Sequence, residues 1–563
     1  MNTSTPEGAV PRPILDIASG LGLDQSAIEP LGWYKAKFAL GYEKVTAARS
    51  QGHYVGVTAI TPTPLGEGKT VNTIGLAMGL SRLGYKAICT LREPSLAPVF
   101  GIKGGGAGGG KSRLLPHDEI NLHFTGDLHA ITSANNLLAA MIDNHLKRNL
   151  EPRISPESIT WRRVLDISDK GLTSIVTGLG DVPQAPLRET AFDLTAASEV
   201  MAILALASNL ADLRKRIGRI LVGLTPDGRP VTADDVGAAG AMTALMRDAV
   251  RPNLVQTCEH TPAIVHAGPF ANIAHGNSSI LADRLALGLA DYVVTESGFG
   301  SDCGAEKFFH IKCRQSGLNP AVEVLVCTVR AMKFHSGRFR VRPGQPLPAE
   351  MVEENLAALK SGAVNLQGHI EILKQFGVRV IVAINQFPTD TDAELKLLAD
   401  LAREYGADDV ANVNCFAEGG AGSVKLAEKV VAACQKPQKP WQELYTLDMP
   451  FEEKLHNLAT KVYGADGVDL SPLAQKRWNT LTELGYGKFP ICIAKTQYSL
   501  SHDPQLLGRP RGFRLPIRDL RVAAGAGFVY AIAGEILTMP GLPSKPSARN
   551  IDIDGQGRIV GVQ

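Results

Sequence analysis

An apolar run that passes through a glycine- and proline-rich loop into a helical pattern constrains the fold of this chain more than any other feature. Residues 53–61, HYVGVTAIT, have the composition of a buried strand, and the pattern that begins at Lys69 and continues through IGLAMGLSRLG is helical. The loop between them, TPTPLGEGKT, ends in Gly68-Lys69-Thr70. A strand, a tight loop and a helix in this order predict a βα unit of a parallel sheet.

This loop also has the residues of a phosphate-binding loop. Successive backbone N–H groups and a helix N-terminus bind phosphate oxygens, the Lys69 ammonium group reaches the terminal phosphates, and the Thr70 hydroxyl can bind Mg²⁺. The match to G-x-x-x-x-G-K-[ST] is incomplete because its first position is Thr63, and the alternative is a tight strand-to-helix turn with a chance GKT. The predicted phosphate loop consists of Thr63, Pro64, Leu65, Gly66, Glu67, Gly68, Lys69 and Thr70.

Four further apolar runs predict more strands of the same sheet. They cover residues 86–92, 291–298, 322–329 and 378–387. Each run is too apolar for a half-exposed strand, which indicates the centre of a parallel sheet. The predicted fold class is therefore α/β, with a P-loop NTPase-like, mostly parallel sheet that has helices on both faces, plus two smaller α+β domains.

Length and local pattern suggest how the chain divides, because 563 residues are more than one hydrophobic core can use. Residues 165–255 change character: LTAASEVMAILALASNLADLRKRIG predicts a helix, and two short extended pieces follow, joined by a turn at Pro226-Asp227-Gly228. The segment QKPQKP, residues 435–440, reads as a linker. We expect a nucleotide-binding domain of residues 1–164 and 256–440, an inserted α+β domain of residues 165–255, and a C-terminal α+β domain of residues 441–563.

Charge and composition exclude several classes of partner. Lys and Arg number 58 against 56 Asp and Glu, with no basic tail, which argues against a nucleic-acid binder. The longest stretch without these charged residues, His260 to Ala282, contains histidines and prolines that a bilayer would not accept. The N-terminus has no apolar segment after a basic start, so no secretory signal is expected. Eight cysteines without a CxxC pair indicate reduced thiols, and we expect a cytoplasmic protein.

Polar residues lie near the carboxyl ends of two of the predicted strands. Glu296 lies in DYVVTESGFG, which is similar to the strand of P-loop enzymes that carries an acidic residue toward magnesium, although an isolated strand-end Glu is more often solvated. Asn385 lies near the carboxyl end of the run at 378–387. Ligands gather at the carboxyl ends of parallel strands, so both residues are candidates for the same site.

Several long motifs, in one order, then carry a family resemblance. They are REPSLAPVFGIKGGGAGGGKSRLLPHDEINLHFTGDLHAITSANN (92–136), TPLGEGKT, GPFANIAHG (268–276), TESGFGSDCGAEKFFHIKCR (295–314), NQFPTDTDAEL (385–395) and AKTQYSLSHDP (494–504). Together they resemble formate–tetrahydrofolate ligase, also called formyltetrahydrofolate synthetase, from YKAKF (34–38) to TMPGLP (538–543).

The resemblance implies a reaction in which MgATP phosphorylates formate and the amine of tetrahydrofolate attacks the resulting formyl phosphate, giving 10-formyltetrahydrofolate, ADP and phosphate. It implies that Lys69 and Thr70 hold the ATP phosphates and magnesium, and that Arg92 neutralises the transferring phosphoryl group or formyl phosphate. A surface ion pair is the alternative for Arg92. Because the family is activated by potassium or ammonium, Glu93 is expected beside a monovalent cation.

His123, Asp127 and His129 form an H-x-x-x-D-x-H pattern that could also be read as metal ligands. The resemblance implies roles near formyl phosphate and the folate amine, in polarisation or proton transfer, and His275 is a further candidate of this kind. The alternative for His275 is a satisfied structural histidine. The glycine-rich run 104–110 would be a flexible loop in isolation and, within the family, a mobile active-site segment.

Folate needs a flat apolar slot in which its rings can stack. The resemblance maps this slot onto Phe299, Phe387, Pro388 and Phe416. Phe416 is a departure, since family members often carry Trp at this position, and the smaller ring affects pterin affinity rather than chemistry. For each aromatic residue alone, core packing is the alternative.

Two other functions are compatible with a phosphate loop. One is another P-loop ligase that activates a different small carboxylate or carbon dioxide, as dethiobiotin synthetase does, and it would not need the aromatic set. The other is a nucleotide switch that loads a metal or a partner, which the absence of Cys pairs and of a switch-like charged face disfavours. The resemblance further implies a homotetramer.

Overall fold

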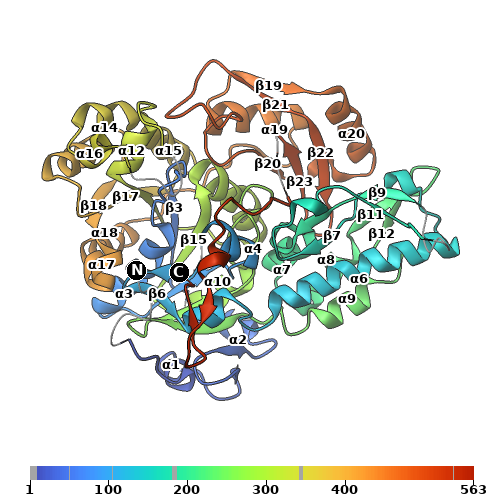
Figure 1. Cartoon of the computed structure of the whole chain (residues 1–563), viewed down its shortest axis with the longest axis horizontal. Coiled ribbons are helices and arrows are strands. Elements are labelled where there is room, and N and C mark those ends of the chain that lie inside the picture. Colours follow the sequence, from blue (N-terminus) through green and yellow to red (C-terminus); the bar gives the residue numbers. More distant parts are fainter. Residues whose placement is uncertain are drawn as a thin grey trace.

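A mixed sheet of 12 strands forms the centre of the part of the chain that the computed structural model describes, namely residues 9–47, 49, 51–103, 105–180, 187–341, 347–534, 536 and 538–562. Its main path has the order β1-β2-β13-β14-β4-β15-β3-β16-β17-β18. Figure 1 labels β15, β3, β17 and β18 of this path. The bounds along this path are β1 Ile28–Pro30, β2 Ala36–Phe38, β13 Asn253–Thr257, β14 Pro262–Val265, β4 Ala87–Leu91, β15 Tyr292–Gly300, β3 His53–Ala59, β16 Val322–Cys327, β17 Arg379–Asn385 and β18 Asp409–Val413.

The strands from β14 to β18 all run parallel, as the apolar runs predicted. The five predicted strands are confirmed and form consecutive neighbours from β4 to β17. An antiparallel extension of β13, β2 and β1 was not predicted, and neither was the small pair of β5 (Gly108–Gly109) and β6 (Ser112–Leu115) that joins it.

Helices cover both faces of the parallel sheet. Neighbouring residues on a strand point to opposite faces, so Val294 packs in one core with α3 (Lys69–Arg82) and α18 (Val424–Cys434). Val293 packs in another core with α10 (Ile280–Leu287) and α15 (Val364–Lys374). The predicted α/β class with helices on both faces is therefore confirmed.

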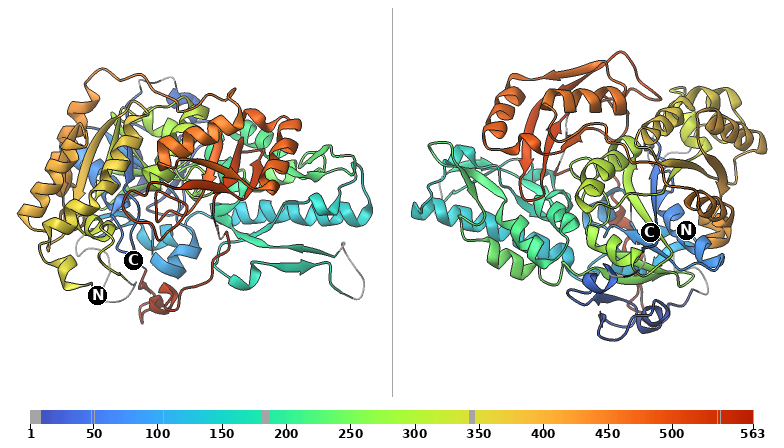
Figure 2. Two further views of the ribbon diagram at one scale, coloured as in Figure 1. Left: turned by 90° about the horizontal axis from the view of Figure 1, so that it is seen from above. Right: turned by 180° about the vertical axis from the view of Figure 1, so that it is seen from behind.

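A second core lies beside the sheet (Figures 1 and 2). It is built from helices and a hairpin: α6 Asp127–Arg148, α7 Glu199–Leu206, α8 Leu210–Gly218, α9 Ala239–Leu245, β11 Leu221–Leu224 and β12 Pro230–Thr232. The expected single helix through residues 194–218 is wrong. The chain leaves helical geometry at Ala207, and the Asn209 side chain then accepts a hydrogen bond from the Asp212 N–H, so that α8 begins as a separate capped helix.

The C-terminal region contacts both of these parts. Its three-stranded sheet consists of β20 Ile491–Ala494, β23 Phe528–Ile532 and β22 Asp519–Ala523. Cys492 and Phe528 of this sheet pack in the second core, whereas Ile491 and Val529 pack in the core that also holds Val293. The domain boundaries given above remain a prediction.

The remaining elements surround these cores. The helices are α1 Ile14–Gly20, α2 Glu43–Ala47, α4 Leu96–Pro98, α5 His117–Asn121, α11 Arg314–Ser316, α12 Val329–His335, α13 Ala349–Val352, α14 Leu356–Gly362, α16 Asp392–Glu404, α17 Cys415–Glu418, α19 Phe451–Leu458 and α20 Pro472–Glu483. The small sheets are β7 Arg163–Leu165 with β10 Phe192–Leu194, β8 Ile175–Thr177 with β9 Arg188–Thr190, β19 Gly467–Leu470 with β21 Arg514–Ile517, and β24 Asp552–Ile553 with β25 Ile559–Val560.

Within the described residues, none of these helices combines the length and the apolar character needed to cross a membrane. All eight cysteines are free, and seven of them are buried.

Candidate active site

Several of the predicted site residues follow the carboxyl ends of neighbouring parallel strands. The phosphate loop follows β3, Arg92 and Glu93 follow β4, and Phe387 follows β17. Because these strands are parallel and adjacent, their carboxyl ends meet at one edge of the sheet.

The phosphate loop is held by hydrogen bonds that leave the start of α3 uncapped. The Thr63 N–H donates to Glu67 Oε1 over 2.8 Å, and Asn385 Nδ2 of β17 donates to the Glu67 carbonyl over 3.1 Å. Gly68, with φ of 76°, is the N-cap residue of α3 and provides no side-chain cap. Since no acidic residue lies in the first turn either, the helix N-terminus beside Lys69 can bind an anion.

The carboxyl group of Glu67 closes this loop on itself. Burial raises the pKa of Glu67, and the hydrogen bonds from Thr63 oppose that rise. Glu67 therefore shapes the loop through its contact with Thr63.

Arg92 and Glu296 meet beside the loop. Nη2 of Arg92 lies 3.7 Å from Oε1 of Glu296, and Nη1 donates to the Pro269 carbonyl over 3.1 Å. A Cβ atom on Gly298 would lie 2.7 Å from the Cβ of Ala271 and 3.0 Å from Nη2 of Arg92, so a larger residue there would have to shift these neighbours. Oε2 of Glu296 is buried without a hydrogen-bond partner among the described residues, which leaves it available to a ligand.

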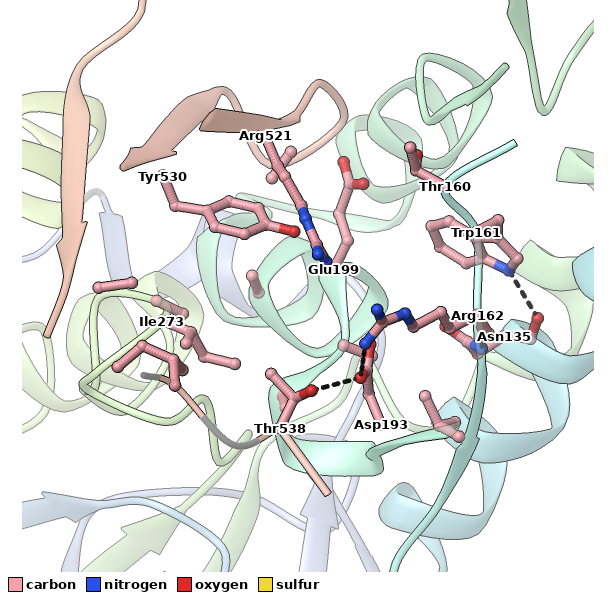
Figure 3. A pocket seen from close by; sticks show the side chains of 18 of the residues that line it. Asn135, Thr160, Trp161, Arg162, Asp193, Glu199, Ile273, Arg521, Tyr530 and Thr538 are labelled. Atoms are coloured by element: carbon pink, nitrogen blue, oxygen red, sulfur yellow. Dashed lines mark hydrogen bonds and ion pairs between the residues drawn. The ribbon is translucent and has the colours of Figure 1, made fainter. Parts of the chain in front are cut away.

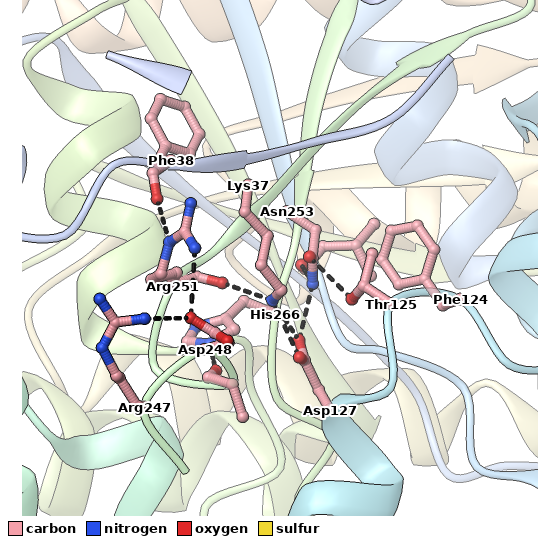
Figure 4. A network of polar contacts seen from close by, with 12 residues as sticks. Lys37, Phe38, Phe124, Thr125, Asp127, Arg247, Asp248, Arg251, Asn253 and His266 are labelled. Atoms are coloured by element: carbon pink, nitrogen blue, oxygen red, sulfur yellow. Dashed lines mark hydrogen bonds and ion pairs between the residues drawn. The ribbon is translucent and has the colours of Figure 1, made fainter. Parts of the chain in front are cut away.

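Asp127 belongs to a buried polar cluster with Lys37, Asn253 and His266 (Figure 4), and Glu93 lies close enough to interact electrostatically with Asp127 and Lys37. Asp127, the first residue of α6, accepts hydrogen bonds from Lys37 Nζ and from Asn253 Nδ2, each over 2.8 Å. Oε2 of Glu93 has no hydrogen-bond partner among the described residues. Burial and the Asp127 carboxylate raise the pKa of Glu93 well above its ordinary value, while the Lys37 ammonium group opposes the rise.

The three predicted histidines differ in burial. His275 is fully buried, and neither ring nitrogen has a hydrogen-bond partner among the described residues. Burial, with the nearby charges of Lys312 and Arg92, lowers the pKa of His275 well below its usual value. His123 and His129 are exposed, in contrast to Asp127 between them.

The described residues contain no group of three or more His, Cys, Asp or Glu side chains that could hold a metal ion. The metal-ligand interpretation of the H-x-x-x-D-x-H pattern therefore has no structural support.

A pocket of about 680 Å³, here called the aromatic pocket, lies directly beside the phosphate loop. It is lined by Leu65, Gly66, Gly68, Val71, Arg330, Asn385, Gln386, Phe387, Pro388, Asn414, Phe416 and Ala417. The Arg330 guanidinium carbon lies 3.4 Å from the centre of the Phe387 ring, and Phe416 is 60% exposed. The pocket thus presents two aromatic rings at the edge of the sheet.

Phe299 does not line this pocket, although the sequence placed it with Phe387 and Phe416. It lies near the end of β15, is half-buried, and has φ of 57°. A left-handed conformation is uncommon for a bulky residue and is characteristic of functional sites under strain.

The glycine run contacts the aromatic pocket from one side. Gly108 and Gly109 form β5, and a Cβ atom on Gly110 would lie 2.2 Å from the Phe416 carbonyl oxygen. Because Gly110 has φ of 57° and this close neighbour, only glycine fits there. Gly104 lies outside the described residues.

Two side chains that contact predicted site residues were missed by sequence reasoning. Arg330 is the second residue of α12 and lies three residues beyond the carboxyl end of β16, so the strand-end rule could have identified it. Lys37 gave no signal, because its partner Asp127 is distant in the sequence and the two meet only through the fold.

A second cavity, of about 280 Å³, lies between α7 and the C-terminal sheet (Figure 3). Arg162 Nη1 lies 3.0 Å from Asp193 Oδ1, and the Thr538 hydroxyl donates to the same oxygen over 2.6 Å. Glu199, Arg521 and Tyr530 complete its polar wall. None of the predicted site residues lines this cavity.

Comparisons with known proteins find similarity over nearly the whole chain. A family model described as formate–tetrahydrofolate ligase matches residues 3–563. A formate–tetrahydrofolate ligase of Desulforamulus reducens is 55% identical, over 98% of this chain and 97% of its own length. The enzyme of Roseiflexus castenholzii is 55% identical, over 98% of this chain and 98% of its own length. The enzyme of Saccharopolyspora erythraea is 53% identical, over 98% of this chain and 97% of its own length.

Proposed function

Because the chain belongs to the formate–tetrahydrofolate ligase family, we propose that the carboxyl edge of its parallel sheet is the active site of that reaction. ATP activates formate as formyl phosphate, and the formyl group passes to tetrahydrofolate to give 10-formyltetrahydrofolate, ADP and phosphate. Formate itself is a poor electrophile because its carboxylate is charged and resonance-stabilised. The acyl phosphate supplies the leaving group that formyl transfer needs.

One observation carries the proposal: the phosphate loop is itself a wall of the aromatic pocket. Leu65, Gly66 and Gly68 line the same pocket as Phe387 and Phe416. A ring system stacked in this pocket would lie beside the phosphates bound to the loop. Such proximity is what transfer from formyl phosphate to a folate amine requires.

In the first step a formate oxygen attacks the γ-phosphorus of ATP, and the bond to ADP breaks. The N–H groups that begin α3, together with Lys69 and Thr70, bind the phosphates. Arg92, held by Pro269 and Glu296, stabilises the charge on the transferring phosphoryl group.

In the second step the folate amine attacks the formyl carbon, phosphate leaves, and the amine loses a proton. His123, His129 and His275 are the candidates to take this proton. His275 is buried with neither ring nitrogen partnered among the described residues, so both nitrogens are available to a ligand.

Two cations fit the residues at this edge. Magnesium would be held by Thr70, Glu296 and the ATP phosphates, and the unpartnered Glu296 Oε2 supports this assignment. A monovalent cation, potassium or ammonium, would be held by the unpartnered Glu93 Oε2 beside Asp127. When bound, the two ions neutralise charge on the phosphates and on the buried carboxylates.

We further propose that the protein works in the cytoplasm as a homotetramer, without nucleic-acid or membrane partners. The free, mostly buried cysteines are consistent with a reducing compartment.

The test is one assay with MgATP, formate, tetrahydrofolate and a potassium salt, in which 10-formyltetrahydrofolate and ADP are followed together and each substrate is omitted in turn. We expect product only when all three substrates are present, with one ADP per formyl group. ADP formation without formate, or the use of another carboxylate, would favour a different ligase of the dethiobiotin synthetase kind.

A further inference from the structure

Thr61 lies between β3 and the phosphate loop, and its N–H, carbonyl and hydroxyl groups are all bonded to buried side chains. The N–H donates to Asn365 Oδ1 over 3.3 Å, and the hydroxyl oxygen accepts from Asn365 Nδ2 over 2.9 Å. The same oxygen lies 2.9 Å from His369 Nε2, and His335 Nε2 lies 3.0 Å from the Thr61 carbonyl oxygen. These four residues, here called the Thr61 cluster, are all buried. Because burial keeps bulk water from competing for these hydrogen bonds, they hold Thr61 firmly.

The contacts of the His335 ring show that the Thr61 cluster is satisfied beyond Thr61 itself. Nε2 faces a carbonyl oxygen, which only accepts, so this nitrogen carries the hydrogen. Nδ1 faces the Gly508 N–H over 3.4 Å, and an N–H only donates, so Nδ1 is the acceptor. This tautomer is uncharged, in agreement with burial, which lowers the pKa of His335 to about 4. Asn365 Nδ2 donates to the Gly508 carbonyl over 2.7 Å, so the C-terminal region also supports the cluster.

The Thr61 cluster connects the phosphate loop with two elements that carry other candidate site residues. His369 Nδ1 lies 2.6 Å from the hydroxyl oxygen of Ser301, which directly follows β15, the strand of Glu296. His335 is the last residue of α12, the helix that contains Arg330. The position of Thr61 is therefore fixed relative to the strand of the proposed magnesium ligand and to a wall of the aromatic pocket.

Hydrogen bonds within the phosphate loop can transmit the position of Thr61 to the start of α3. Thr63, two residues later, donates through its N–H to Glu67 Oε1, and its carbonyl accepts from the Gly66 N–H over 3.2 Å. Asn385 holds the Glu67 carbonyl at the other end of the loop. A loop that is bonded to itself and held at both ends moves as a unit, so a displacement of Thr61 would also displace the N–H groups that begin α3.

We propose that the Thr61 cluster positions the phosphate loop for ATP, so that its hydrogen bonds set the affinity of the folded enzyme for the nucleotide. This inference rests on the proposed function, since it takes the loop as the ATP site. Asn365, His335 and His369 act through Thr61 and are positioning residues. A purely structural cluster would instead lower the stability of the protein on substitution and leave the ATP affinity of the folded enzyme unchanged.

The test begins with Thr61→Val, which replaces the hydroxyl group by a methyl group and removes the partner of Asn365 Nδ2 and His369 Nε2. We expect the Kd for MgATP, measured by titration calorimetry without formate or folate, to rise by about three- to thirtyfold. Thr61→Ser keeps the hydroxyl group and should bind MgATP within about twofold of wild type, although the lost methyl group lowers its melting temperature. Melting curves verify that each variant is folded at the temperature of the titration.

Thr261→Val is the matched control, because Thr261 is also buried and its hydroxyl group donates to Ser81 Oγ over 3.2 Å. Thr261 directly precedes β14, so it lies at the amino edge of the parallel strands, opposite the candidate site. This variant should lose stability and keep the wild-type Kd for MgATP. If Thr61→Val does not fold, His369→Leu takes its place, since it removes both ring contacts of His369, and the same rise in Kd is expected.

Lys69→Ala separates failure of this inference from failure of the proposed function. If Lys69→Ala loses MgATP binding and Thr61→Val weakens it while Thr61→Ser and Thr261→Val do not, the positioning role is supported. If Lys69→Ala loses binding but the folded Thr61→Val or His369→Leu variant keeps the wild-type Kd, the positioning inference alone is overturned. It is also overturned if Thr61→Ser or Thr261→Val weakens binding as much as Thr61→Val. If Lys69→Ala binds MgATP normally, the loop is not the ATP site, and the inference falls with that assignment.

Discussion

Lys69 is the first residue of α3, so its ammonium group and the helix N-terminus act on the same phosphates in the proposed complex. We expect Lys69→Ala to lower ATP-dependent turnover by at least about 10²- to 10³-fold, because it removes a charge that stabilises the transferring phosphoryl group. Product formation measures the loss, and a melting curve checks the fold. Lys436→Ala, at an exposed position, is the control. Near-normal activity of Lys69→Ala with a native melting curve would show that the phosphate loop is misassigned.

Substitution of Phe416 tests whether the aromatic pocket binds the folate rings by stacking. It is 60% exposed, so its substitution should not disturb the core. We expect Phe416→Ala to raise the KM for tetrahydrofolate by about three- to tenfold through lost stacking, and Phe416→Trp to lower it by about two- to threefold. The KM values for ATP and formate should stay constant in both variants. A tryptophan variant that binds folate more weakly than wild type would contradict a stacking role.

The residues at the site were predictable to different degrees. The phosphate loop could be recognised because its function depends on a local sequence of strand, loop and helix. Lys37 could not be recognised, because it acquires its role only when Asp127 and Asn253 are brought to it from distant segments. Phe299 was placed by resemblance, and its left-handed backbone was not visible in the sequence.

At the level of elements, the phosphate loop is joined to β17 through a hydrogen bond from Asn385. Substitutions at two glycines of the loop can distinguish the effect of backbone strain from the effect of losing this hydrogen bond. Both glycines have a positive φ, 73° at Gly66 and 76° at Gly68. A Cβ atom on Gly66 would meet open space, whereas a Cβ atom on Gly68 would lie 2.4 Å from Asn385 Nδ2. We expect Gly66→Ala to lower stability by about 1 kcal/mol and to keep nucleotide affinity. Gly68→Ala should also displace Asn385 from the Glu67 carbonyl and weaken ATP binding by about tenfold or more.

Titration calorimetry with ATP and urea unfolding of both variants provide the two readouts. Equal ATP affinities for Gly66→Ala and Gly68→Ala would mean that the contact between Asn385 and the loop does not support the nucleotide site.

The strands and helices differ in how well their sequence patterns predict them. Strands buried on both faces, such as β16 and β17, appear as continuous apolar runs and were predicted. β14 has four residues, and β18 is an edge strand of sequence DVANV, so neither gives such a run. The break between α7 and α8 was missed because the apolar pattern continues across Asn209, and the side-chain cap decides the geometry there.

At the scale of the whole molecule, the C-terminal region is attached to the second core by a carboxyl group. Glu199, at the start of α7, accepts hydrogen bonds through Oε1 from the Gly525 N–H over 2.7 Å and from the Ala526 N–H over 3.3 Å. It also lines the second cavity with Arg521 and Tyr530 (Figure 3). No sequence pattern predicted this contact, because the two segments are joined only by tertiary packing.

The protonation of Glu199 makes this attachment dependent on pH. Burial raises the pKa of Glu199 to about 7 from an ordinary value of 4.5, while the two N–H donors oppose the rise. Between these values the folded state binds the proton and the unfolded state releases it. The contribution to stability is therefore fully present below about pH 4.5 and is lost as the pH rises through about 7.

Glu199→Gln should remove this dependence, because the amide oxygen can still accept from Gly525 and Ala526. We expect the variant to match wild type near pH 5 and to exceed its free energy of unfolding by up to about 3 kcal/mol near pH 8. Urea unfolding of both proteins at several pH values measures the difference, with Glu428→Gln, an exposed carboxylate on α18, as the control. Parallel pH profiles for wild type and Glu199→Gln would mean that this carboxyl group does not titrate between the folded and unfolded states. Unfolding free energies of the two proteins that differ near pH 8 and converge near pH 5 would place a pH-sensitive contact at the junction of the C-terminal sheet and α7.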